Sequence, residues 1–249
     1  AYSLTLTERE TGRKFEQMLS VTVYGKGESR ERFERAQQQS IFPTAIGDGL
    51  FHLPELEAVV WMFPNDRKLA WLPVIANSER LKNEILPGVL SRSFGEARKI
   101  TALTTEIVHY AAERACTVRV TLKREGEAEP MALFGKTYCE GEGEPTWQAM
   151  QALWQSDGRV REQLLIPQPL AFQPESNTIW QFALSGKTLL ECDDGSESFY
   201  ELLEKAGAAI AALHRCDLSG LSQLGIADVI SRLESAEQLI ATVCPQHRQ

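Results

Sequence analysis

The stretch Met131-Ala132-Leu133-Phe134-Gly135-Lys136-Thr137-Tyr138 decides the fold, because it completes a run of strand patterns that starts well before it. Residues 117–123 alternate apolar and polar side chains and are rich in β-branched residues, which is typical of a half-buried strand. Residues 124–127 (Arg-Glu-Gly-Glu) indicate a turn between these two strands, so they form an antiparallel hairpin. Residues 100–108 are also rich in β-branched residues, and we expect the preceding strand there.

A helix and two more extended segments are predicted after this hairpin. Pro145 and Thr146 can begin a helix that carries four large apolar side chains on one face, Trp147, Met150, Leu153 and Trp154. Residues 165–172 contain two prolines, which favour an edge strand or an extended segment over a central strand. Residues 178–184 are a further predicted strand.

Helical patterns dominate the rest of the chain. Residues 199–214 place their apolar side chains on one stripe, and a second helical pattern covers residues 226–243, after a break at Ser219-Gly220. The change from strands to helices after Leu184 predicts a boundary between two lobes.

The first ninety residues contain a similar succession of patterns. Four pairs of segments correspond in order: 3–10 with 119–125, 21–28 with 132–136, 41–43 with 165–167, and 52–63 with 172–182. The offsets drift between roughly 110 and 125 residues, as gaps in the loops of a repeat would produce. We interpret this as an internal duplication of one strand-rich unit. Two strand-helix-strand units that merely share ordinary patterning are the alternative.

Composition excludes several classes of protein. The formal net charge of -8 over 249 residues argues against nucleic-acid binding, which needs clustered Lys and Arg. The five cysteines are widely spaced and the four histidines form no HExxH motif, which favours reduced thiols and gives no sign of a metal site. There is neither a signal-peptide pattern at the start nor an apolar run of roughly 20 residues, so we expect no membrane partner and a cytoplasmic protein.

Lys136 is the main candidate for chemistry. It is predicted late on a strand, beside Gly135, which has no side chain. A lysine placed in this way can reach phosphate oxygens, and phosphoryl transfer depends on such neutralisation of charge. Considered alone, a strand lysine is more often a solvated edge residue.

The order of elements around Lys136 resembles the aminoglycoside phosphotransferase and choline-kinase-like family of small-molecule kinases. The resemblance covers roughly residues 100–217 and depends on the order of short segments, namely 110–120, Phe-Gly-Lys-Thr-Tyr at 134–138, Ile-Pro-Gln-Pro-Leu at 166–170, Leu-Ser-Gly-Lys-Thr-Leu at 184–189 and Ala-Ala-Leu-His at 211–214. It implies a protein-kinase-like small lobe, made of an antiparallel sheet and a helix, followed by the first helices of a helical large lobe.

The resemblance also implies a set of nucleotide-binding residues. Lys136 would hold the α- and β-phosphates of ATP. Backbone groups of Gln181, Phe182, Ala183 and Leu184 would form the hinge that meets the adenine edge. ATP and Mg²⁺ are the implied cofactors, and the partners are the nucleotide and a small-molecule substrate.

The sequence departs from the family pattern at several points. Residues 106–115, where the phosphate-covering loop is expected, contain no glycine. The helix that should oppose Lys136 with a carboxylate offers Gln148 and Gln151 instead. No His-Gly-Asp follows His214, so no catalytic residue and no metal ligand are assigned, and Asp217 is expected to end a helix.

Two further features have plainer explanations. The stretch Glu140-Gly141-Glu142-Gly143-Glu144 would repel phosphate and is expected to be a solvated loop. Lys26, the counterpart of Lys136 in the earlier unit, is expected to be silent because Pro64 falls where a hinge should pass.

The sequence thus predicts an α+β fold with a degenerate small-lobe-like repeat at 1–90, a nucleotide-binding small lobe at 91–184 and the beginning of a helical large lobe at 185–249. The predicted function is ATP-dependent phosphotransfer to a small hydroxylated molecule, with the catalytic segment missing from this chain. A non-catalytic kinase-like interaction or regulatory module is the rival hypothesis, and an unrelated α+β protein with the same order of elements is a third. The sequence specifies neither the acceptor nor the oligomeric state.

Overall fold

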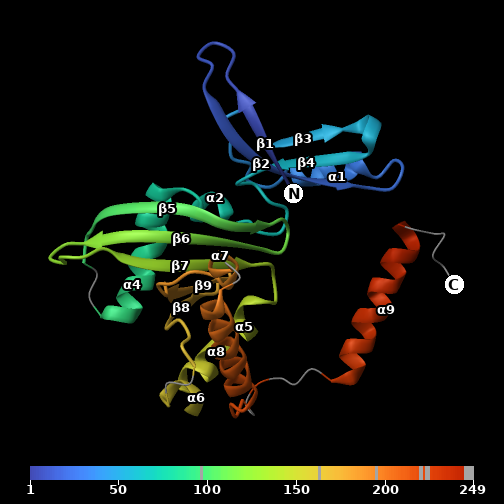
Figure 1. Cartoon of the computed structure of the whole chain (residues 1–249). Coiled ribbons are helices and arrows are strands. Elements are labelled where there is room, and N and C mark those ends of the chain that lie inside the picture. Colours follow the sequence, from blue (N-terminus) through green and yellow to red (C-terminus); the bar gives the residue numbers. More distant parts are fainter. Residues whose placement is uncertain (96–97, 162–163, 194–195, 219–220, 222–224, 244–249) are drawn as a thin grey trace.

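The chain forms two antiparallel sheets, with helices packed on each sheet (Figure 1). Residues 63–71, called the connecting segment below, lead from the last strand of the first sheet to the helices that precede the second sheet. The structure is a computed structural model that describes residues 1–95, 98–161, 164–193, 196–218, 221 and 225–243, with backbone alone for 232 and 239–243. The α+β class predicted from the sequence is confirmed.

The first sheet has the strand order β1-β2-β4-β3. Its strands are β1 (Tyr2–Thr7), β2 (Lys14–Val23), β3 (Leu50–Leu53) and β4 (Ala58–Met62), with the 3-10 turn η1 (Pro54–Leu56) before β4. Helix α1 (Ser29–Ala36) packs against β3 and β4. Every residue of β4 is buried, because Val59 and Trp61 face the core under α1 while Val60 and Met62 pack with Leu19.

The second sheet has the strand order β5-β6-β7-β9-β8. Its strands are β5 (Ile100–Ala111), β6 (Ala115–Arg124), β7 (Met131–Tyr138), β8 (Pro169–Gln173) and β9 (Thr178–Phe182). The predicted strands all form, and the proline-containing segment supplies β8 at the edge, where a missing N–H is tolerated. Helix α5 (Gly143–Gln155) packs against β8 and β9 and is followed by α6 (Asp157–Val160).

Four helical segments between the sheets were not predicted from the sequence. They are α2 (Leu72–Ile75), α3 (Ser78–Arg80), the π-helical η2 (Leu81–Ile85) and α4 (Leu86–Phe94). Leu81, Leu86 and Leu90 from these segments share one core with Val120 and Trp180 of the second sheet. The boundary expected at residue 90 therefore falls inside α4, in a segment whose core contacts belong to the second sheet.

The two sheets share a strand order. Strands β1-β2-β4-β3 follow the same path as β6-β7-β9-β8, and in both units a helix connects the second of these strands to the next in the chain. The predicted duplication requires this correspondence, although a shared topology also arises from independent units. The duplication stays a prediction.

The last part of the chain is helical. It comprises α7 (Leu189–Cys192), α8 (Glu197–His214) and α9 (Ile226–Val243), so the two long helices lie where the apolar patterns predicted them. The predicted break at Ser219-Gly220 lies outside the described residues. Helix α9 stands apart from both sheets (Figure 1), and one stripe of it is exposed, formed by Ile226, Val229, Ile230 and Leu233.

None of the described helices combines the length and the apolar character needed to cross a bilayer.

Candidate functional site

Lys136 lies on the open face of the second sheet. Its neighbours Gly135 and Thr137 on β7 are buried, whereas the Lys136 side chain is exposed. Side chains alternate between the faces of a strand, so Lys136 points away from the core that Gly135 and Thr137 face. Its Nζ atom lies 4.7 Å from the centre of the Tyr138 ring, a cation–π contact on the same face.

The predicted hinge segment lies beside the lysine strand. In the register of β7 and β9, Phe134 is opposite Gln181 and Lys136 is opposite Ile179. The pairing continues beyond β9, because the Ala183 N–H donates to the Ala132 carbonyl at 2.9 Å. The structure therefore brings Lys136 and the predicted hinge residues, Gln181, Phe182, Ala183 and Leu184, onto two adjacent strands and their extension.

The face that carries Lys136 is polar across three strands. Thr117 and Arg119 of β6 are opposite Lys136 and Phe134, so all four side chains lie on this face. Arg119 is exposed, and Phe134 is half-buried. Glu106 of β5 is opposite Arg119 and is also exposed, so this face offers two cations, one carboxylate and one aromatic side chain.

Among the described residues, Lys136 has no carboxylate partner. The ion pairs near the second sheet join other residues, such as Arg67 with Glu113 and Arg124 with Glu127. Helix α5, which was expected to approach the lysine, packs against β8 and β9. Glu144 near its start lines a cavity at the end of β7.

The turn between β5 and β6 makes a contact that the sequence did not reveal. Glu113 in this turn has φ of +61°, and its N–H donates to Asp66 Oδ2 at 2.9 Å. Its carboxylate accepts from Arg67 Nε at 3.0 Å and from Thr22 Oγ1 at 3.2 Å. Two residues of the connecting segment and one residue of the first sheet therefore hold this turn. Sequence patterns do not pair positions so far apart.

Asp66 is the centre of this junction. Its side chain is 3 % exposed and accepts from the Tyr110 hydroxyl at 2.7 Å as well as from Glu113. It also accepts from the N–H groups of Lys68 at 2.8 Å and Leu69 at 3.0 Å, as a residue that starts a helical turn does. Four donors satisfy this carboxylate, which a buried charge requires.

The junction perturbs two of its members. Burial, followed by the charge of Asp66, raises the pKa of the Tyr110 hydroxyl well above its usual range. Burial raises the pKa of the Glu113 carboxyl, but the hydrogen bonds and charge of Arg67 and the hydrogen bond of Thr22 outweigh it, so this pKa lies below its ordinary value. Both side chains therefore keep the protonation states that the observed hydrogen bonds need near neutral pH.

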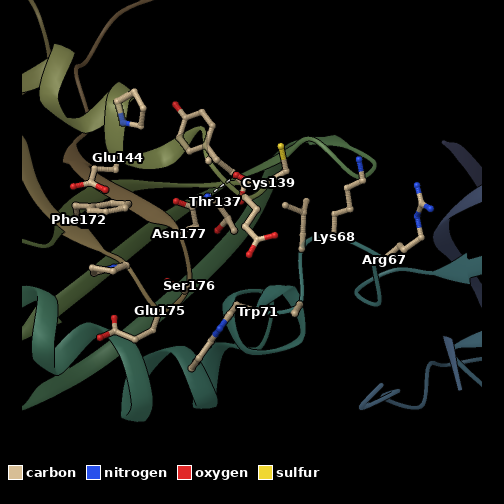
Figure 2. A pocket seen from close by; sticks show the side chains of 17 residues that line it. Arg67, Lys68, Trp71, Thr137, Cys139, Glu144, Phe172, Glu175, Ser176 and Asn177 are labelled. Atoms are coloured by element: carbon tan, nitrogen blue, oxygen red, sulfur yellow. Dashed lines mark hydrogen bonds between the residues drawn. The ribbon is translucent and has the colours of Figure 1, made fainter. Parts of the chain in front are cut away.

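A cavity of about 910 Å³ lies at the end of β7, next to the position of Lys136 (Figure 2). Its walls come from the connecting segment, the end of β7, the start of α5 and the turn between β8 and β9. The aromatic side chains of Trp71 and Phe172 line this cavity (Figure 2). Its lining also contains basic and acidic side chains, among them Lys68, Glu144 and Glu175. None of the predicted nucleotide-binding residues lines it, and its mixed charges single out no ligand class.

A Ser-His-Glu cluster in the first unit resembles the composition of a hydrolytic triad but not its chemistry. Ser29 Oγ donates to Glu57 Oε2 at 2.6 Å and lies 2.9 Å from His52 Nε2. Because the Ser29 proton goes to the carboxylate, His52 acts as donor and not as base. Glu57 also accepts from the Gly27 and Ser29 N–H groups, at 2.7 and 3.3 Å, so the cluster secures the start of α1.

Two other residues considered in the sequence, Lys26 and Asp217, lie outside the strands and helices. Lys26 lies in the turn after β2 and not on a strand, so it does not share the setting of Lys136. Asp217 is exposed just after α8. Among the described residues, no group of three or more His, Cys, Asp or Glu side chains is placed to hold a metal ion.

Comparisons of the chain with protein-family models, curated proteins and solved structures found no match.

Proposed function

We propose that this protein is an ATP-dependent phosphotransferase acting on a small hydroxylated molecule, with Lys136 as its phosphate-binding cation. The observation that carries the proposal is the pairing of β7 with β9. It places an exposed lysine and the residues expected to meet adenine on neighbouring strands of one sheet.

The chemistry of Lys136 suits this role. A nucleotide triphosphate concentrates negative charge on oxygens, and an ammonium group on a rigid strand offers three donors to them. Arg119, on the same face, adds a second cation. The resemblance of residues 100–217 to the aminoglycoside phosphotransferase and choline-kinase-like group agrees with this arrangement.

The described residues fit the nucleotide better than they fit the metal. The ammonium of Lys136 can bind phosphate. In the predicted hinge the Phe182 and Ala183 N–H groups already donate to the Gln168 and Ala132 carbonyls, at 3.0 and 2.9 Å, so adenine would have to meet other backbone groups of residues 181–184. Mg²⁺ is usually held by substrate phosphates with one or two carboxylates, and the described part of the chain gathers no such ligand group. When bound, the metal would neutralise phosphate charge. The residues of this chain would orient the nucleotide.

Calorimetric titration of the chain with Mg-ATP tests the proposal. We expect saturable binding that Lys136→Ala weakens by roughly ten- to a hundredfold, because a charge-assisted hydrogen bond contributes about 1.5–3 kcal/mol. Lys123→Ala is the matched control, since Lys123 is exposed on the same face of β6 and should change affinity less than about twofold. The proposal fails if the parent does not bind Mg-ATP, or if Lys136→Ala binds equally well.

A non-catalytic kinase-like interaction or regulatory module is the second candidate. Two observations favour it: the turn expected over the phosphates is tied to the connecting segment, and Lys136 has no carboxylate partner among the described residues. A folded chain that ignores Mg-ATP at millimolar concentration would support this module over the enzyme.

A further inference from the structure

The turn between β5 and β6 is held from outside its own sheet. Asp66 of the connecting segment binds the Glu113 N–H, and Arg67 and Thr22 bind the Glu113 carboxylate. Thr22 belongs to β2, so the contact spans both sheets. This is the same turn that the proposed function places over the phosphates of ATP.

The holding contact lies on the face opposite Lys136. Cys116 is paired with Thr137, and Thr117 is paired with Lys136, so Cys116 and Lys136 lie on opposite faces. Tyr110 is paired with Cys116, and both pack with Leu69 and Leu72. Because the Tyr110 hydroxyl binds Asp66, the turn is drawn toward the α2 side of the sheet and away from the lysine.

The backbone N–H groups of Glu113 and Arg114 in the held turn are not free to bind phosphate. Loops that cradle phosphate do so with free backbone N–H groups. Here the Glu113 N–H is donated to Asp66, and the Arg114 N–H is donated to the Ala111 carbonyl at 3.0 Å.

The contacts with Asp66 and Arg67 maintain an unfavourable backbone conformation at Glu113. Its φ of +61° is unfavourable for a residue with a Cβ atom and persists where surrounding contacts fix it. Asp66 fixes the amide and Arg67 fixes the side chain. Releasing both would let the turn leave this conformation.

We infer that the Asp66–Arg67–Glu113 junction is an autoinhibitory contact, in which the first unit and the connecting segment hold the phosphate-covering turn away from the Lys136 face. The inference rests on the proposed function. Nucleotide binding then requires the junction to open, and the observed affinity is reduced by the small fraction of molecules in which it is open.

Two substitutions test this by releasing the turn in different ways. Arg67→Gln removes the ion pair, and Glu113→Ala removes the carboxylate but keeps a Cβ atom, so that the positive φ still disfavours the held conformation. Both should tighten Mg-ATP binding to the full chain by roughly three- to tenfold, because they raise the open fraction. Glu129→Gln is the control, since it removes one exposed negative charge from another loop and should leave affinity unchanged.

Unchanged or weaker affinity for Mg-ATP in both variants overturns the autoinhibitory contact. If Lys136→Ala leaves the affinity for Mg-ATP unchanged both in the parent and in the two variants, the proposed function fails as well. Tighter binding of Mg-ATP in both variants than in the parent supports the inference.

Discussion

Gly135 lies directly against the indole ring of Trp180, so that a Cβ atom at position 135 would come within 2.6 Å of Trp180 Cζ3. The ring cannot move aside easily, because Trp180 is fully buried and its Nε1 donates to Gln173 Oε1 at 2.9 Å. The close approach of β7 to this ring therefore depends on glycine, and it fixes the strand on which Lys136 stands.

Gly135→Ala should destabilise the protein by about 1–3 kcal/mol, because an added methyl group overpacks this core. Gly207→Ala in α8 is the matched control, since no atom lies near its added Cβ and its φ is ordinary. The control should gain up to roughly 1 kcal/mol from the helix propensity of alanine. Urea denaturation measures both, and equal stability of Gly135→Ala and the parent would contradict the packing described above.

Asp66→Ala should cost about 2–4 kcal/mol of unfolding free energy, because it leaves the Tyr110 hydroxyl and the Glu113 N–H buried without an acceptor. Asp66→Asn keeps one acceptor oxygen and should cost less. Chemical denaturation of both variants checks this order, and equal costs would show that the charge of Asp66 matters and its acceptor oxygens do not.

The ion pair of Glu113 predicts a loss of stability in acid. Its folded pKa lies below the ordinary value of 4.5, so its contribution is complete above pH 4.5 and disappears as the pH falls through the folded pKa. The free energy of unfolding should therefore decrease as the pH is lowered from 4.5. Arg67→Gln should weaken this part of the pH dependence, and denaturation curves at pH 7, 4.5 and 3 provide the comparison.

Cys116 should resist alkylation in the folded protein. Burial and then the nearby charge of Asp66 raise the pKa of this thiol to about 12, and the side chain is fully buried. Cys192, which is partly exposed, is the internal control and should react first. Peptide mapping after brief iodoacetamide treatment measures both thiols, and equal labelling would show that the Cys116 environment opens readily.

Leu86→Ala and Leu233→Ala should differ sharply. Leu86 is fully buried in the core shared with the second sheet, so its truncation should cost about 2–5 kcal/mol. Leu233 is 64 % exposed on α9, and its truncation should change stability by less than about 0.5 kcal/mol. Thermal denaturation of the two variants would show whether α4 is as integral to the second unit as its packing implies.

Local patterns predicted most of the elements in this fold. The alternation in residues 117–123 identified β6, and the single apolar stripe of residues 199–214 identified α8, because burial on one side leaves a periodic trace. The two prolines placed β8 at an edge for a steric reason. The helices from Leu72 to Phe94 gave no clear period, since they are short and interrupted by Pro73 and Pro87.

The site was predictable only in part. Lys136 and residues 181–184 were grouped through the family resemblance alone. The structure brings them close because β9 pairs with β7, and their role as a nucleotide site stays a prediction. The junction at Asp66 could not be found in this way. Its partners Tyr110 and Glu113 lie more than forty residues away, and only the packed arrangement of the two sheets selects them.

The separation of the cores has a consequence for biosynthesis. The core residues of the first sheet lie between Leu19 and Met62, and none of its strands comes from later in the chain. This unit can therefore complete its core while residues beyond 100 are still being translated. The β5–β6 hairpin then emerges next to a platform that is already folded, and Asp66 and Arg67 are in place to receive Glu113 as soon as the hairpin closes.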